Sequence, residues 1–300
     1  MMKLASELAE ALAAGRPAVA LESTLICHGI PKPDNAELAL EMERRVRAEG
    51  ALPATMAVID GAVRVGLSEN ELMALAAADD VAKCTTRDLP LAMAAGGRGA
   101  TTVASTIYLA ARHGIGVMAT GGLGGVHLGG EHSLDVSADL FELQRSPVAV
   151  VCAGIKSILD QRRTMEVLES LGVPVIGYRC RELPAFYTAE SGIDIAGVDD
   201  LDALVRIIRS HRALGLPSGL VIATPPPARF ALDGDETARL VDAAKSAAEQ
   251  AGIRGAAQTP FMLRHMAEHS EGRTVTLNIQ LAVANASLAA KLATKLAVQT

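Results

Sequence analysis

A lysine at the end of an apolar segment carries the sharpest chemical signal in the sequence. Lys156 follows the uncharged run 147–153 and precedes Asp160. Burial at the end of a strand disfavours the charged form of a lysine, and a neutral amine is a nucleophile that forms Schiff bases with sugar carbons. The local sequence also allows a structural role, in which Lys156 pairs with Asp160 or extends into solvent.

A carboxylate and several basic residues are candidates to act beside this lysine. Glu22 lies at the carboxyl end of a predicted strand, where open α/β sheets bind ligands, and it is either a catalytic acid or base or half of a structural ion pair. Three basic residues lie near threonines and glycines whose backbone amides are suited to binding a phosphate: Lys83, Arg87 and Arg98. The alternative is that these charges lie on a solvated surface. The sequence contains no Walker loop and no dinucleotide-binding fingerprint.

The glycine-rich segment 120–130 and the acidic residues after it indicate a ligand or metal site. The glycines allow the backbone to approach a ligand closely. Asp135 and Asp139 supply oxygen ligands that suit magnesium or manganese, and His127 and His132 are further candidate ligands. The alternative is that the first aspartate or the serine after it caps the following helix, and that the glycines only form turns.

Apolar segments that alternate with helical patterns predict an α/β fold. The segments 147–153 and 220–223 are continuously apolar, as in strands that are covered on both faces. We therefore expect a three-layer α/β/α fold in a single domain over residues 1–300, with a mixed, largely parallel central sheet and the C-terminal helices packed on it. Strands are predicted at 17–21, 54–59, 62–65, 81–84, 116–119, 147–153, 173–177 and 220–223.

Helices are predicted between these strands and after the last one. Ser68 and Glu71 have the spacing of a capping box at the start of a helix that continues to 78. Thr259 is the predicted cap of a later helix, with Pro260 at its first position. The remaining C-terminal helices are predicted over 235–251 and from 277 to the end of the chain.

Composition and charge exclude several classes of protein. The net charge is −6, 2% of residues are aromatic and there is no tryptophan, so the basic stripe and stacking surfaces of a nucleic-acid-binding protein are missing. The four cysteines form no C-x-x-C pair. No stretch approaches the roughly 18 uncharged residues of a membrane span. We expect a cytoplasmic protein that acts on a small molecule, with neither a nucleic acid nor a membrane as its partner.

Five motifs, in order along the chain, resemble the pseudouridine-5'-phosphate glycosidase family, which includes proteins described as indigoidine synthase A-like. The resemblance extends from about residue 5 to the C-terminal helices. The motifs are ALEST at 20–24 with HGIP at 28–31, KCTTRD at 83–88, TGGLGGVH at 120–127, DVSADL at 135–140 and GIKSILD at 154–160.

The resemblance implies an activity and a role for each of several residues. The implied reaction is reversible cleavage of pseudouridine 5'-phosphate to uracil and ribose 5-phosphate, with a divalent metal ion, usually Mn²⁺. Lys156 is then the nucleophile, Glu22 the proton donor and Asp135 the metal ligand. Family members are trimers, so a homotrimer is expected. The implied substrate contacts are Lys83, Val103, Ser137, Ala138, Asp139 and Asn278, with Asn285 as a competing candidate for the last role.

A carbon-linked base explains why a lysine takes the place of the usual carboxylate pair. Ordinary glycosidases protonate a departing atom that carries a lone pair, whereas the base of pseudouridine leaves from a carbon atom. Attack of the Lys156 amine at the anomeric carbon, with Glu22 protonating the ring oxygen, opens the sugar and leaves an imine after uracil departs. Two alternatives stay open: an aldolase-like Schiff-base enzyme acting on another sugar phosphate, and a sugar-phosphate-binding protein without turnover.

Overall fold

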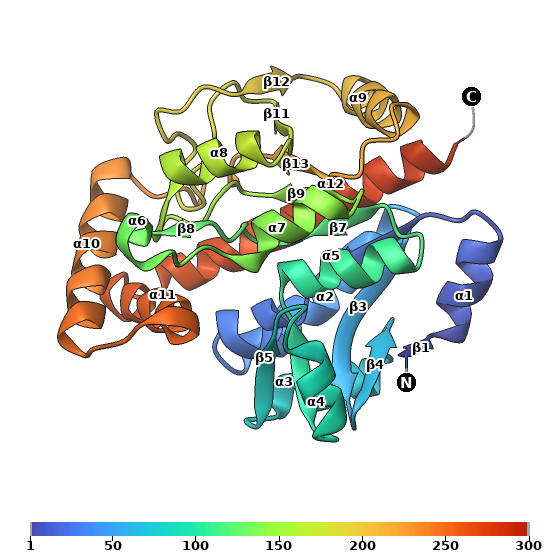
Figure 1. Ribbon diagram of the computed structural model, residues 1–300, viewed down its shortest axis with the longest axis horizontal. Helices are drawn as coiled ribbons and strands as arrows, with labels where there is room; N and C mark the ends of the chain where they lie inside the picture. The colour runs from blue at the N-terminus through green and yellow to red at the C-terminus, as the bar shows by residue number, and fades with distance from the viewer. Residues whose placement is uncertain (1, 299–300) are drawn as a thin grey trace.

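A mixed, largely parallel sheet runs through the centre of the molecule, and helices cover both of its faces (Figure 1). The computed structural model describes residues 2–298. The predicted three-layer α/β/α fold is confirmed. Along the sheet the strands lie in the order β1 (Met2–Leu4), β4 (Ala62–Val65), β3 (Leu52–Ile59), β2 (Ala18–Leu21), β7 (Val117–Ala119), β9 (Ala149–Cys152), β13 (Leu220–Ala223), β11 (Val175–Tyr178) and β12 (Ala196–Val198).

Strand direction divides this sheet into two parts. From β3 through β2, β7, β9, β13 and β11 to β12, every neighbouring pair is parallel. On the other side of β3, β4 is antiparallel to it. Along the edge opposite β4, the end of β3 is antiparallel to β6 (Arg98–Thr101), and β5 (Val81–Cys84) pairs with β6 in parallel. A separate antiparallel pair joins β8 (Val126–His127) and β10 (Leu159–Asp160).

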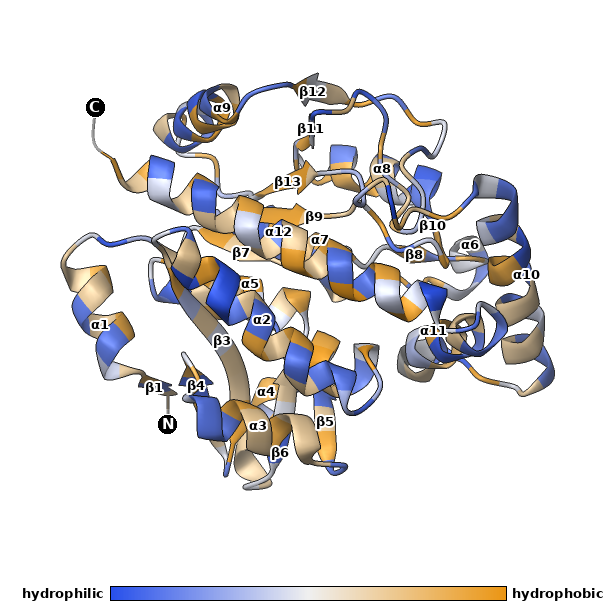
Figure 2. Ribbon diagram, turned by 180° about the vertical axis from the view of Figure 1, so that it is seen from behind, coloured by the Kyte–Doolittle hydropathy of each residue, from blue (hydrophilic) through white to orange (hydrophobic). Residues whose placement is uncertain are grey.

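Two hydrophobic cores join the layers, because successive residues of a strand point to opposite faces. Val19 and Leu21 of β2 pack with α2 (Asp34–Ala48), α9 (Leu201–Ala213) and α12 (Arg273–Ala297). Ala18 and Ala20 pack on the opposite face with α1 (Ser6–Ala13), α5 (Val103–Arg112), α7 (Ala138–Arg145) and α8 (Gln161–Ser170). Figure 2 shows the mixed apolar and polar surfaces of α2 and α12, which contact each other on their face of the sheet.

The remaining helices lie around this centre. They are α3 (Glu69–Ala77), α4 (Leu89–Ala94), α6 (Gly130–Ser133), α10 (Gly234–Gln250) and α11 (Gln258–His269), with the short turns η1 (Leu25–Gly29) and η2 (Gly255–Ala257). The predicted capping box is confirmed at the start of α3, where the Ser68 hydroxyl accepts from the Glu71 N–H and the Glu71 carboxylate accepts from the Ser68 N–H. Within residues 2–298, every helix is too short or too polar to span a bilayer.

Several elements differ from the sequence-based expectation. Five strands are not predicted, because they are short segments whose strand conformation depends on pairing with a partner: β1, β6, β8, β10 and β12. The predicted cap at Thr259 is wrong: α11 begins at Gln258, Ala257 occupies the capping position, and no side chain caps the helix. The last helix begins at Arg273, four residues before the predicted start at 277.

Candidate active site

A cavity lies where the order of the parallel strands reverses. From β2 the chain passes through α2 to β3 on one side, whereas β7 leads to β9 on the other. The carboxyl ends of strands at such a reversal form the usual ligand crevice of an open α/β sheet. The cavity has a volume of about 480 Å³. Of the residues named above as site candidates, Arg98, His132 and Asn285 are not in its lining. The lining includes Glu22, Lys83, Arg87, Val103, His127, Asp135, Ser137, Ala138, Asp139, Lys156 and Asn278.

Strand register brings Glu22 beside Thr120. Leu21 of β2 and Ala119 of β7 are paired, so the residues that follow them leave the sheet at the same level. The Thr120 hydroxyl donates a hydrogen bond to the Glu22 carboxyl, which is 7% exposed. Within residues 2–298 no ion pair joins Glu22 to an arginine, so the structural alternative is not formed. Glu22 instead lines the cavity.

The environment of Glu22 favours its protonated form. Burial raises the pKa of the Glu22 carboxyl, while the positive charge of Lys156 and the hydrogen bond from Thr120 oppose that change. The net direction is upward from the ordinary value of 4.5. A carboxyl that keeps its proton in a closed site is suited to act as a general acid.

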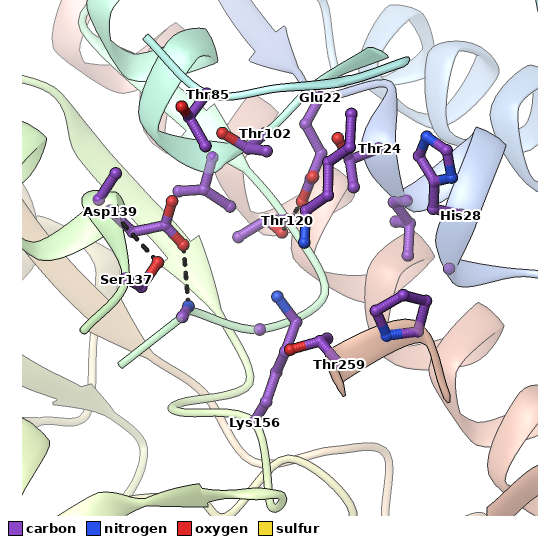
Figure 3. A pocket seen from close by; sticks show the side chains of 18 of the residues that line it. Glu22, Thr24, His28, Thr85, Thr102, Thr120, Ser137, Asp139, Lys156 and Thr259 are labelled. Atoms are coloured by element: carbon purple, nitrogen blue, oxygen red, sulfur yellow. Dashed lines mark hydrogen bonds between the residues drawn. The ribbon is translucent and has the colours of Figure 1, made fainter. Parts of the chain in front are cut away.

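Lys156 is held by the glycine-rich loop that follows β7. Its backbone N–H donates to the Leu123 carbonyl at 3.1 Å, and the Leu123 N–H donates to the Gly154 carbonyl at 2.9 Å. Gly154 has a φ of +77°, and a Cβ there would lie 1.9 Å from the Pro184 carbonyl oxygen, so only glycine fits. In Figure 3 the Lys156 side chain extends from this segment toward Glu22.

The amine of Lys156 is unpaired in the part of the chain that the structure describes. No hydrogen bond or ion pair joins it to residues 2–298. The alternative pairing with Asp160 is excluded because that carboxylate pairs with Arg163 and accepts from the Arg163 N–H at 3.0 Å, which caps α8. The amine is therefore free to meet a ligand in the cavity.

Gly122 lies between the stem of this lysine and the ring of Phe186. A Cβ at Gly122 would lie 2.5 Å from the Phe186 ring and 3.3 Å from Cγ of Lys156, so a glycine is required between them. Phe186 is buried with a φ of +66°, a conformation that is rare for a bulky residue, and its N–H donates to the Ala153 carbonyl at 3.0 Å. The surrounding structure therefore imposes this geometry on the wall of the cavity.

Two helix N-termini lie at one side of the cavity. Thr102 caps α5 and Ser137 caps α7, so that Val103 and Ala138 occupy the first helical positions. N–H groups at such positions have no acceptor within the helix, and the helix dipole there favours an anion. Lys83, in β5, lines the same cavity. Burial lowers the pKa of Lys83, and the charge of Lys156 lowers it further.

Asp139 organises this region. One carboxylate oxygen accepts from the Ala104 N–H at 2.9 Å, and the other accepts from the Gly124 N–H at 3.0 Å. Its side chain thus links the beginning of α5, the glycine-rich loop and the beginning of α7. Figure 3 shows Asp139 and Ser137 together at this side of the cavity. Because both oxygens of Asp139 already accept hydrogen bonds, Asp139 is poorly placed to ligate a metal ion.

Asp135 and His127 are the remaining candidates for a metal ion. Asp135 Oδ2 lies 4.0 Å from His127 Nδ1, and both residues line the cavity, whereas His132 is exposed. Burial lowers the pKa of His127, and the Asp135 carboxylate acts in the opposite direction. Within residues 2–298, no group of three or more His, Cys, Asp or Glu side chains could hold a metal ion. One free carboxylate fits a hydrated Mg²⁺ or Mn²⁺, which retains several waters, better than a zinc ion enclosed by protein ligands.

The two asparagines of α12 have different surroundings. Asn278 lines the cavity and is 4% exposed, and within residues 2–298 its Oδ1 has no hydrogen-bond partner. Asn285 lies outside the lining and donates to the Thr120 carbonyl at 2.8 Å and the Gly121 carbonyl at 3.3 Å. Asn278 therefore lines the cavity with its Oδ1 unpaired within residues 2–298, and Asn285 holds the backbone that follows β7.

The two arginines do not join Lys83 as the sequence suggests. Arg98 pairs with Asp80 at 2.8 Å, outside the cavity. Arg87 reaches the edge of the cavity, but its side chain is exposed and pairs with Asp88 at 3.0 Å. Asp88 belongs to the same motif as Arg87, whereas Asp80 lies 18 residues before Arg98 and outside its motif.

Comparison with known proteins assigns this chain to a family. The family model described as "Indigoidine synthase A like protein" matches residues 7–295. The chain belongs to this family. Similar to it are the pseudouridine-5'-phosphate glycosidases of Herpetosiphon aurantiacus, 52% identical over 294 residues (98% of this chain, 97% of the relative), and of Alkaliphilus metalliredigens, 48% identical over 297 residues (98% and 96%).

A solved structure extends the similarity to three dimensions. The prealnumycin C-glycosynthase AlnA, in complex with ribulose 5-phosphate, matches this chain with a TM-score of 0.91 and 37% sequence identity. The match covers 99% of this chain and 97% of AlnA. The indigoidine synthase A-like fold is therefore shared over essentially the whole described chain.

Several residues that line the cavity of this indigoidine synthase A-like protein are not predicted as site residues from the sequence. Phe186 comes from the long connection between β11 and β12, and Thr259, Pro260 and Leu263 come from the beginning of α11. The sequence around Thr259 predicts only a helix start. Because these segments reach the cavity through tertiary packing, no local spacing signals their position.

Proposed function

We propose that this protein is a pseudouridine-5'-phosphate glycosidase, which reversibly cleaves the C-glycosidic bond to give uracil and ribose 5-phosphate. The names of the full-length relatives support this activity. The observation that carries the proposal is the pair formed by Glu22, a buried carboxyl whose pKa is raised by burial, and the unpaired amine of Lys156. An acid facing a nucleophile suits the opening of a sugar ring.

In the proposed mechanism, Lys156 and Glu22 act on the two ends of one bond. The neutral amine of Lys156 attacks C1' while the C1'–O4' bond breaks, and O4' takes the proton of Glu22. The Glu22 carboxylate then takes a proton from the nitrogen, whose lone pair forms a C1'=N bond as the C1'–C5 bond breaks. Glu22 returns this proton to uracil C5. Water hydrolyses the resulting imine, which releases ribose 5-phosphate and regenerates the amine.

Lys83 and the side of the cavity that carries the two helix N-termini supply the binding that this chemistry requires. Lys83 and the N-termini of α5 and α7 suit the 5'-phosphate, because they combine a cation with unpaired backbone N–H groups. Holding the phosphate fixes the position of C1' between the acid and the nucleophile. In this proposal, the substrate phosphate is bound at the N-terminal ends of α5 and α7, which carry Val103, Ser137 and Ala138. Asp139 positions both helices.

We also propose that a hydrated divalent cation, Mn²⁺ or a similar ion, binds at Asp135. The free carboxylate beside the half-buried His127 supports this site. A bound cation supplies positive charge and ordered water at its end of the cavity. Residence in the cytoplasm stays a prediction from the sequence composition. Assembly as a homotrimer stays a prediction from the family resemblance, and light scattering of the purified protein tests it.

Removal of divalent ions is expected to suppress turnover, and added Mn²⁺ is expected to restore it. Asp135→Asn should raise the Mn²⁺ concentration needed for half-maximal activity by at least about tenfold, because a neutral amide binds a cation more weakly than a carboxylate does. His132→Ala, at an exposed position outside the cavity, is the matched control and should behave as the wild type. Full activity after exhaustive chelation would show that Asp135 is not a metal ligand of the active enzyme.

Synthesis from the two products tests the proposed activity. Incubation with uracil and ribose 5-phosphate should give pseudouridine 5'-phosphate, identified by chromatography against the authentic compound. An aldolase-like enzyme would yield no such compound but would cleave another sugar phosphate. A binding protein without turnover would bind ribose 5-phosphate and yield neither product nor a reducible adduct. Either of the last two results would contradict the proposed function.

A further inference from the structure

Asn285 is a buried polar residue that the proposed mechanism does not use. It is 1% exposed and lies in α12 between the buried residues Ala282 and Ala286, where the helix packs on β7 and β9. A buried side-chain amide costs free energy unless it is hydrogen-bonded, so its partners indicate its role. Its Nδ2 group has two hydrogens, and it donates to two successive backbone carbonyls, those of Thr120 at 2.8 Å and Gly121 at 3.3 Å.

These carbonyls belong to the segment in which the chain leaves the sheet and enters the cavity. Ala119 is the last paired residue of β7, and beyond it the Thr120 N–H donates to the Val151 carbonyl of β9 at 3.0 Å. Thr120 is thus held at both of its peptide groups, through its N–H by β9 and through its C=O by Asn285. Because peptide groups are planar, holding both of them fixes the backbone dihedral angles of Thr120 and the direction of its side chain.

The side chain of Thr120 contacts the proposed general acid. Its hydroxyl donates a hydrogen bond to Oε1 of Glu22, and Figure 3 shows the two side chains together. In a protonated carboxyl, one oxygen carries the hydrogen and the carbonyl oxygen accepts. Because Oε1 accepts from Thr120, Oε2 is the oxygen that carries the proton. A proton on Oε1 would instead point at the Thr120 hydroxyl and away from a bound sugar.

We propose that Asn285 is a positioning residue for the general acid: by holding the Thr120 carbonyl, it directs the Thr120 hydroxyl to Oε1 of Glu22 and so places the transferable proton on Oε2. This inference rests on the proposed function and adds to it a residue that acts on the chemistry from outside the cavity. Because Asn285 does not line the cavity, its loss should slow the chemical step and leave substrate binding nearly unchanged.

The pH profile separates this role from a purely structural one. Burial raises the pKa of Glu22, and the hydrogen bond from Thr120 opposes that change. Loss of the hydrogen bond should therefore raise the pKa further and move the alkaline limb of activity to higher pH. A loosened site that admits water would move the limb to lower pH, because less burial lowers the pKa of a carboxyl.

The test leaves the other titratable groups around Glu22 in place. Three charged residues act on the pKa of its carboxyl: Lys156, Asp139 and Lys83. His28, His127 and Asp135 line the same cavity. Because none of these residues is substituted in the test, a change in the alkaline limb reports on the contact between Thr120 and Glu22.

Asn285→Ala and Thr120→Val, singly and together, test the inference. Thr120→Val keeps the shape of the side chain and removes only the hydroxyl. Each single variant should lower kcat for pseudouridine 5'-phosphate about tenfold, with KM changed by less than about twofold. Each should also move the alkaline limb to higher pH. The double variant should be no slower than Thr120→Val, because both substitutions act through one contact.

Thr294→Val is the matched control on the same helix. The Thr294 hydroxyl donates to the backbone carbonyl of Glu49 at 3.0 Å, outside the cavity. Loss of this hydrogen bond should lower the melting temperature and leave kcat and the pH profile unchanged. Asn285→Val fills more of the vacated space and provides the same measurement should Asn285→Ala fail to fold.

Other outcomes overturn the inference and separate it from the proposed function. An alkaline limb that stays in place or moves to lower pH in the Asn285 variant would mean that this residue only stabilises the fold. The same result in Thr120→Val would mean that its hydroxyl does not act on the acid. A double variant whose loss equals the product of the two single losses would mean that Asn285 acts by another route. A wild-type enzyme that does not cleave pseudouridine 5'-phosphate would overturn the proposed function itself.

Discussion

Lys156→Ala is expected to abolish turnover of pseudouridine 5'-phosphate, with a loss on the order of a thousandfold or more, because no other group then forms the bond to C1'. The side chain lies at the cavity and forms no ion pair with residues 2–298, so its removal should leave the fold intact. Steady-state and single-turnover rates, with the melting temperature beside them, measure these effects.

Two further variants sharpen this prediction. Lys156→Arg keeps the positive charge but cannot form an imine, so it should be as inactive as Lys156→Ala. Lys291→Ala removes a lysine that pairs with Glu49 at 3.4 Å outside the cavity, and it should retain wild-type activity. Full activity in either Lys156 variant would contradict a covalent role for this residue.

Glu22→Gln is expected to slow the chemical step by roughly 100-fold or more, with a modest change in substrate affinity, because the amide keeps the shape and the Thr120 contact but has no proton to give. Burial raises the pKa of Glu22, so the wild-type activity that depends on its protonated form should fall as the pH rises through that raised pKa. This alkaline limb should be missing from the pH profile of Glu22→Gln. Single-turnover rates equal to those of the wild type would remove Glu22 from the mechanism.

The thermal stability of Glu22→Gln provides a control, because the substitution that slows catalysis is expected to leave the unfolding temperature unchanged or to raise it. Because the folded-state pKa of Glu22 lies above its ordinary value of 4.5, the folded protein binds more protons than the unfolded chain between these two values. Stability contributed by this group is therefore present at low pH and is lost as the pH rises through that window. A glutamine does not ionise, so the variant should unfold at the same or a higher temperature at neutral pH.

The sequence reveals the residues whose position depends on local features. Glu22 and Lys156 follow apolar segments, and the carboxyl ends of parallel strands lie along one edge of a sheet, so both residues are expected at that edge. The capping box at Ser68 is likewise local, since it depends on two residues three positions apart. The central strands and the parallel sheet follow from the same continuous apolar patterns.

Long-range packing determines what the sequence does not reveal. Phe186 reaches the cavity from a connection far along the chain, in a backbone conformation that the surrounding structure imposes. Thr259 lines the cavity although its sequence context predicts only a helix cap. Arg98 is drawn away from the cavity by Asp80, a partner that its own motif does not contain. Whether Asn278 or Asn285 faces the cavity also depends on how α12 packs.

Borohydride reduction in the presence of ribose 5-phosphate, followed by mass spectrometry of the intact protein and of its peptides, tests the central claim most directly. We expect a single reduced sugar-phosphate adduct, located on the peptide that contains Lys156 and missing in Lys156→Ala. No adduct, or an adduct on another residue such as Lys83 with Lys156 unmodified, would contradict the account.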